Sequence, residues 1–362
     1  MPESFMEFAY FANKLSFNCK KHLFSMKPCI ELSLQKKLFQ SVNSVLPKSY
    51  SLVNTLSEML GLSIDSTYRR IRGETFLTID EVAIICHKFN ISFDSLLSNH
   101  NVNTVTFNFS SMTSEEKFVD YLKSIARDVK MFAASNNSLV IYAAEDIPLP
   151  HSFRIPHLSS FKTFYWLRSV VHDEKYMNMK FNRNLISGET IDICKEIFNS
   201  YSKVPTIEIW SDVTQVSFLM QIRYIWESGL FENKEEALYV CSLARDEFDF
   251  VEKQAEKGQK LDANNNPSMD EGSYMLYHSD IEIGNNTIFV KIEDHNLLML
   301  THNTLNRLTT SNARICNETE RWLKNLIKKS TLLSGVGEKQ RFKFFRNIRN
   351  ELKELEDSIK ES

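Results

Sequence analysis

Glycine is unusually scarce in this sequence, with nine residues among 362. Average usage of about 7% would give roughly 25 glycines in a chain of this length. Folds that depend on many glycine-cornered loops are therefore disfavoured. No glycine lies between Gly73 and Gly188, so this long stretch has little of the backbone freedom that flexible catalytic loops use.

Cysteine pairs of the CxxC type are also missing. The six cysteines are far apart, at positions 19, 29, 86, 194, 241 and 316, which indicates neither a disulfide framework nor a zinc knuckle. The nine histidines are scattered as well, and no neighbouring Cys, Asp or Glu has the spacing of a metal ligand. We therefore expect reduced thiols, no metal site and no cofactor.

No run of about 18 apolar residues occurs, and the opening residues MPESFMEF lack the basic segment of a secretory signal. Hydrophobic residues make up 43% of the chain and charged residues 25%, which excludes a disordered or low-complexity protein. These features predict a globular cytoplasmic protein without a membrane span. The length is sufficient for two or three domains.

The formal net charge of −3 is unevenly distributed along the chain. Residues 1–100 carry +2, residues 101–302 carry −10 and residues 303–362 carry +5. The acidic middle is a poor surface for a polyanion. Any nucleic-acid contact should therefore be local, at one of the two basic ends.

The first hundred residues divide into an arm and a helical domain. Residues 1–28 are a mixed apolar and basic segment without a convincing period, which we interpret as the arm. Residues 29–100 then read as five short helices separated by turn residues. These helices are expected at 30–46, 51–60, 64–72, 79–89 and 92–98.

The most informative pattern is SLVNTLSEMLGLSIDSTYRRIRGETFLTIDEVAIICHKFNISFDSLL, at residues 51–97. Gly61 stands where the chain must turn sharply between two helices. Ser63 is placed to cap the second helix, and Thr78 with Glu81 is typical of a capping box. This segment resembles the helix-turn-helix domain of the lambda-repressor-like, or Cro/CI-type, transcription regulators. The resemblance implies a compact helical domain that binds DNA.

The second helix of the motif, at residues 64–72, is the reading helix in such a domain. Ile64, Tyr68 and Ile71 are spaced four and three residues apart, which predicts that they face the core. Three arginines within four residues suit base edges and phosphates. The residues expected to contact DNA are Ser63, Asp65, Ser66, Thr67, Arg69, Arg70 and Arg72. Ser57 stands where the family usually has alanine, and the register of the reading helix stays open by one position.

Residues 101–362 have a different pattern from the short helices before them. Long amphipathic helices are expected at 115–135 and 234–257, and basic helices within 303–362. Short strands are expected at 139–144, 274–283, 287–293 and 296–301, with a hairpin through Gly284 to Asn286. The sequence thus predicts a mainly α fold, α+β overall: an N-terminal five-helix helix-turn-helix domain, then a larger helical region with a few short strands. By analogy with the family, this region would serve dimerisation or sensing.

Two further patterns admit a second interpretation. The aromatic run from Phe161 to Trp166 could line a ligand pocket, but aromatic residues at helical spacing more often form a core. Gly335 to Gln340 resembles part of a phosphate loop, yet neither Ser nor Thr follows Lys339 and no strand is expected before it. We interpret the first as core and the second as a turn before a basic helix.

Together these patterns predict a sequence-specific DNA-binding transcription regulator that acts as a homodimer, reads the major groove with residues 64–72 and is not an enzyme. Its partners would be double-stranded DNA and an unknown small-molecule or protein effector. No membrane partner is expected. The alternative is an adaptor whose helix-turn-helix domain docks a partner protein. Salt dependence separates the two, since phosphate contacts release counterions and apolar docking does not.

Overall fold

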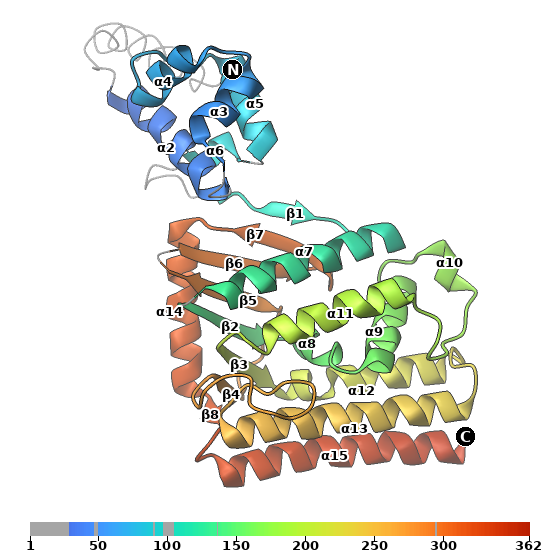
Figure 1. Cartoon of the computed structure of the whole chain (residues 1–362). Coiled ribbons are helices and arrows are strands. Elements are labelled where there is room, and N and C mark those ends of the chain that lie inside the picture. The colour runs from blue at the N-terminus through green and yellow to red at the C-terminus, as the bar shows by residue number, and fades with distance from the viewer. Residues whose placement is uncertain (1–28, 47–49, 90, 97–104, 136, 294) are drawn as a thin grey trace, which may run out of the picture. The chain divides into compact units, whose positions relative to one another are not determined.

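The structure, a computed structural model, describes residues 29–46, 50–89, 91–96, 105–135, 137–293 and 295–362 (Figure 1). Contacts within the chain divide it between Thr106 and Phe107 into an N-terminal and a C-terminal unit. The arm expected at residues 1–28 lies outside the described residues. No helix of the described residues is long and apolar enough to cross a membrane.

Short helices make up the described part of the N-terminal unit. They are α2 (Cys29–Val45), α3 (Leu52–Leu60), α4 (Ile64–Arg72), α5 (Ile79–Phe89) and α6 (Phe93–Leu96). Each matches an expected helix to within a few residues at either end. Their common core includes Leu38, Val42, Leu56, Ile85 and Leu96, all 5% exposed or less. Apolar positions at helical spacing thus come together as amphipathic helices require.

The C-terminal unit is organised around one sheet. Its strands are β1 (Asn108–Ser110), β2 (Ser138–Ala144), β3 (Thr206–Ser211), β4 (Tyr274–Ser279), β5 (Thr287–Ile292), β6 (His295–His302), β7 (Asn306–Thr310) and β8 (Thr331–Leu332). They pair in the order β1-β7-β6-β5-β2-β3-β4-β8. The neighbours β2, β3 and β4 run parallel, and every other pair is antiparallel.

This sheet overturns the expected fold class. The prediction of a mainly helical region with a few short strands is wrong, because the unit is built on an eight-stranded mixed sheet. The hairpin expected through Gly284 to Asn286 is also wrong, since β4 pairs with β3 and β8 while β5 pairs with β2 and β6. Strand pairing of this kind joins segments far apart in sequence, and no local turn signal reports it.

Helices fill connections between the strands, and a last helix follows β8. They are α7 (Glu115–Ala134), α8 (Leu149–Ser152), α9 (Pro156–Ser169), α10 (Glu174–Met177), α11 (Gly188–Tyr201), α12 (Asp212–Glu227), α13 (Lys234–Lys257), α14 (Ala313–Lys329) and α15 (Glu338–Glu361). The parallel strands require crossover connections. Helices α8 to α11 join β2 to β3, and α12 and α13 join β3 to β4 (Figure 1).

The two faces of the sheet have separate cores. Alternate residues of β2 point to opposite faces, as in any strand. Ile141 and Ala143 pack with Leu323 and Leu326 of α14 in the smaller core. Val140 and Tyr142 belong to the larger core, which also takes in α7, α9, α11, α12, α13 and α15. Phe161, Phe164 and Trp166 are buried in it, so the expectation that the aromatic run forms core is confirmed.

The long helices use their apolar stripes inside the unit. Phe118, Leu122, Val129 and Phe132 of α7 are buried in the larger core. Helix α13 is buried along its length in the same way. The apolar stripes of residues 115–135 and 234–257 are therefore used within the unit and are not free to form an interface between two chains.

Two arginines of the basic C-terminal segment are tied to their own unit. Arg349 pairs with Asp249 and Glu252 of α13, and Arg341 is 7% exposed and donates to the backbone carbonyls of Leu333 and Gly335. Helix α15 begins after Gly337, so residues 335–337 form a turn before a basic helix, as expected. A Cβ at Gly337 would press into the carbonyl of Leu332.

Candidate nucleic-acid interface

The turn between α3 and α4 is held by local hydrogen bonds. Gly61 caps α3 with φ +63° and ψ +32°, a left-handed conformation that glycine adopts without steric cost. Ser57 Oγ donates to the Leu62 carbonyl at 2.6 Å. The serine that replaces the usual alanine thus ties the helix to the turn.

Helix α4 starts at a capping serine. Ser63 Oγ accepts a hydrogen bond from the Ser66 amide at 3.2 Å and donates to Ser66 Oγ at 3.0 Å. Thr67 donates from its hydroxyl to the Ser63 carbonyl at 3.0 Å and is 1% exposed. Of the residues expected to contact DNA, Ser63 and Ser66 therefore serve the cap and Thr67 lies within the unit.

The rotation of α4 about its axis differs from the sequence prediction. Ile64 and Tyr68 are each 47% exposed, so the expectation that they face the core is wrong, while the expectation for Ile71, which packs against the core, is confirmed. Thr67 takes the inward position instead. Because the Thr67 hydroxyl donates to the backbone, burying this side chain costs little free energy.

Five side chains form the exposed face of α4, which we call the α4 face. They are Ile64, Asp65, Tyr68, Arg69 and Arg72. The spacing of one, three and four residues places them on one side of a helix. The Arg69 and Arg72 side chains are 55% and 56% exposed, and both lie near Glu74. Exposed ion pairs of this kind contribute little, so both guanidiniums remain available to a partner.

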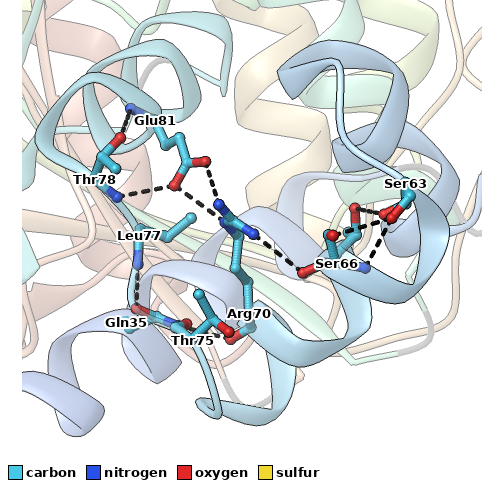
Figure 2. A network of polar contacts seen from close by, with 9 residues as sticks. Gln35, Ser63, Ser66, Arg70, Thr75, Leu77, Thr78 and Glu81 are labelled. Carbon is cyan, nitrogen blue, oxygen red and sulfur yellow. Dashed lines mark hydrogen bonds and ion pairs between the residues drawn. The ribbon is translucent and has the colours of Figure 1, made fainter.

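Arg70 lies in a different environment, at the centre of a polar network (Figure 2). Its guanidinium donates to both carboxylate oxygens of Glu81, at 2.8 and 3.1 Å. Glu81 also accepts from the Thr78 amide at 2.9 Å, and its own amide donates to Thr78 Oγ1 at 3.2 Å, which is the expected capping box. Partial burial favours a higher pKa for Glu81, but the hydrogen bonds from Arg70 and Thr78 outweigh it and lower that pKa.

Gln35 of α2 closes this network from the other side. Its amide nitrogen donates to the carbonyls of Arg70 and Thr75, at 2.7 and 3.0 Å, and its oxygen accepts from the Leu77 amide at 2.9 Å. One side chain thus satisfies three backbone groups in the connection between α4 and α5 (Figure 2). The sequence analysis did not identify Gln35, because these contacts span 35 to 42 residues.

Apolar side chains are also exposed in the connection from α4 to α5. Phe76 is 50% exposed, and Ile79 at the start of α5 is 87% exposed. With Ile64 and Tyr68, the N-terminal unit thus exposes both apolar and basic side chains. Such a surface suits the apolar contacts and phosphate contacts of nucleic-acid recognition, and it also suits a protein partner.

A second concentration of polar groups lies inside the C-terminal unit, around Glu208 of β3. Its carboxylate accepts hydrogen bonds from His151, Tyr201, Trp210 and Tyr274 at 2.8 to 3.0 Å. Burial alone would raise the pKa of Glu208, but His151 and these hydrogen bonds outweigh it and lower that pKa to about 2.

The environment of Glu208 is closed. All five members of this cluster are 4% exposed or less, so it is a structural centre rather than an open site. Among the described residues, no group of three or more His, Cys, Asp or Glu side chains is placed to hold a metal ion.

Comparison with known proteins gives one match. No curated protein and no solved structure is significantly similar to the chain. Residues 48–116, about a fifth of the sequence, match the BetR domain family. This segment runs from the residues before α3 to the first residues of α7 and contains the α4 face. The match is to this family and not to the lambda-repressor type that the sequence suggested. At residues 48–116 the chain is similar to the BetR domain, a helix-turn-helix-like regulator domain.

Proposed function

We propose that this protein is a sequence-specific DNA-binding transcription regulator that inserts α4 into the major groove. The observation that carries the proposal is the α4 face, with two exposed guanidiniums on a helix that follows a tight capped turn. A helix fits the groove, which is about 12 Å wide. The BetR match supports a regulatory role for the same segment.

We select the residues proposed to contact DNA by the exposure of their side chains. Arg69 and Arg72 would contact guanine edges or phosphates, and Asp65 and Tyr68 would contact neighbouring groups. Ser63 and Ser66, at the helix N-terminus, would lie near the backbone phosphates. Arg70 and Thr67 would act only through the fold, because one is engaged by Glu81 and the other is buried.

The remaining assignments rest on the same proposal. One nine-residue reading helix covers only a few base pairs, so we propose a homodimer that reads two half-sites roughly 34 Å apart. The C-terminal unit would supply the dimer contacts and respond to an effector, without catalysis.

The test is selection of bound sequences from random double-stranded DNA with the full chain, followed by titration at several salt concentrations. The proposal expects an enriched motif and a log–log salt slope of about −0.9 for each phosphate contact. The matched variants are Arg69→Gln on the α4 face and Arg127→Gln, an exposed arginine of α7. Absence of an enriched motif, or equal loss in both variants, would contradict it.

The rival function is that of an adaptor. The exposed Ile64, Tyr68, Phe76 and Ile79 favour it, because exposed apolar side chains are typical of protein interfaces when they gather in a patch. An adaptor would bind no DNA sequence selectively, and its partner affinity would change little with salt. Replacement of Ile79 by Ser would weaken an adaptor's binding while leaving contacts by Arg69 intact.

A further inference from the structure

The C-terminal unit contains a cavity of about 450 Å³ that the proposed DNA contacts do not involve. It lies between α7 and the face of the sheet that carries the larger core, next to the carboxyl end of β2. Figure 1 shows α7 passing across this part of the sheet. Pockets for small organic ligands have volumes of about 300–1,000 Å³, so the cavity is large enough for one.

The inner walls of the cavity are apolar. The strand register brings Tyr142 on β2, Ile288 on β5 and Met299 on β6 into one row, since Tyr142 faces Ile288 and Ile288 faces Met299. These three side chains line the cavity from the sheet. The opposite wall is formed by α7 residues Ile125, Val129 and Phe132. An apolar body between these walls would be removed from water on both sides.

Asp128 and Asp146 at the rim are engaged by other side chains of the unit. Arg307 donates to Asp128 at 2.7 Å. Asp146 accepts from Lys162 at 3.2 Å and Gln221 at 2.9 Å on one oxygen, and from Ser217 at 2.6 Å and the Ile147 amide at 2.8 Å on the other. Its lone pairs are therefore occupied. Arg307 keeps a free donor, because its buried Nε has no hydrogen-bond partner among the described residues, and Glu145 also lines the cavity.

Two buried hydrogen-bond donors in the wall lack partners. Tyr142 is 6% exposed and Trp166 is 2% exposed, and both line the cavity. Within the described part of the chain, no group makes a hydrogen bond with the Tyr142 hydroxyl or the Trp166 indole N–H. Burial raises the pKa of Tyr142 well above its ordinary value, so the hydroxyl stays protonated as a donor. An acceptor placed in the cavity would complete these hydrogen bonds.

We infer that this cavity binds a largely apolar organic molecule whose carbonyl or ether oxygen accepts a hydrogen bond from Tyr142 or Trp166. The apolar walls exclude a strongly polar ligand, and the free donors in the wall select an acceptor. This site goes beyond the proposed DNA contacts, and its test involves no DNA, so either proposal can fail alone.

The probe for the test is Nile red, an uncharged apolar dye with a carbonyl oxygen, added to the full chain and followed by its fluorescence. We expect saturable binding of one dye per chain. Ile288→Trp, which fills the cavity from its floor, should weaken binding at least tenfold. Binding that is not saturable, or that survives this substitution in a folded variant, would overturn the inference.

Tyr142→Phe provides a variant that keeps the shape of the wall and should fold as the parent does. Loss of one hydrogen bond should weaken Nile red binding roughly 3- to 10-fold. Tyr277→Phe is the matched control, because Tyr277 packs in the smaller core on the other face of the sheet. Equal effects of the two substitutions would overturn the role of the Tyr142 hydroxyl.

Discussion

Arg70 and Glu81 form a two-pronged ion pair across the connection from α4 to α5, with Nη2–Oε1 at 2.8 Å and Nε–Oε2 at 3.1 Å. Both side chains are only 14% exposed. The pair joins the end of α4 to the capping box of α5, and Gln35 holds the intervening backbone. Neighbouring arginines on one short helix are thus assigned to different tasks, since Arg69 faces outward and Arg70 fixes the helix.

Arg69→Ala should weaken binding to the selected DNA site at least fivefold, because a bidentate contact to guanine is worth about 1–3 kcal/mol. Arg69 is more than half exposed, so the free energy of unfolding should change by less than about 0.5 kcal/mol. Fluorescence anisotropy with labelled DNA measures the first quantity and chemical denaturation the second. Unchanged affinity in both Arg69→Ala and Arg72→Ala would refute the assignment of the α4 face.

Arg70→Ala should act on the fold instead. Removal of one partner leaves the half-buried Glu81 carboxylate without its main donors, which we expect to destabilise the unit by about 1–3 kcal/mol. Hydrogen exchange should accelerate at the amides of Thr78 and Glu81 in particular. Arg69→Ala is the matched control, and similar exchange in both variants would show that the ion pair does not hold the capping box.

The exposed lysines of α15 should contribute little to DNA binding. Arg349 and Arg341 of this segment are already engaged within the unit, the first by α13 and the second by backbone carbonyls. Lys339→Gln with Lys343→Gln should therefore leave the log–log salt slope unchanged, whereas loss of one phosphate contact would reduce it by about 0.9. Salt titrations of the double variant and the parent chain measure the two slopes. A reduced slope would assign DNA contacts to α15.

Glu208→Gln should destabilise the C-terminal unit by about 3 kcal/mol near neutral pH, because only the oxygen of the amide accepts hydrogen bonds and the donors aimed at the second carboxylate oxygen would face its NH2 group. The pKa of Glu208 falls from its ordinary 4.5 to about 2. A lowered pKa stabilises the fold above pH 4.5, and this contribution disappears as the pH falls toward 2. The difference between Glu208→Gln and the parent in denaturant unfolding should therefore shrink below pH 4.5. Glu271→Gln, at an exposed position, serves as control, and a difference independent of pH would contradict this account.

Sedimentation of the full chain should give twice the mass of the 42.2 kDa chain at tens of micromolar. The reason is functional, since two reading helices are needed to cover a palindromic site. A monomer at that concentration, together with a selected DNA motif that lacks two-fold symmetry, would refute the dimer.

Local signals in the sequence predicted the helix-turn-helix segment well. Gly61, Ser63 and the Thr78–Glu81 pair act within a few residues of themselves, so their roles can be read from spacing. The rotation of α4 about its axis could not be predicted from the spacing of its residues. Hydropathy places Ile64 and Tyr68 inward, but the buried position belongs to Thr67, whose hydroxyl is satisfied by the Ser63 carbonyl.

The sheet was less accessible to sequence analysis. Strand β3 is a short segment between two long helices and contains Glu208, so it lacks the uniform apolar character of a buried parallel strand. The carboxylate is tolerated because four side chains from elsewhere in the fold donate to it. The cavity likewise depends on the register of β2, β5 and β6, which no single segment encodes.

Gly337 is required by lack of space and not by its backbone conformation. Its φ of −76° is open to every residue type, so space alone demands glycine, through the carbonyl of Leu332. Even a single added methyl group would have to displace the start of α15, whose Phe345 and Ile348 are fully buried. In a survey of random substitutions this turn should therefore be as intolerant as the interior, and variation between related chains should be rarer here than at the neighbouring Gly335.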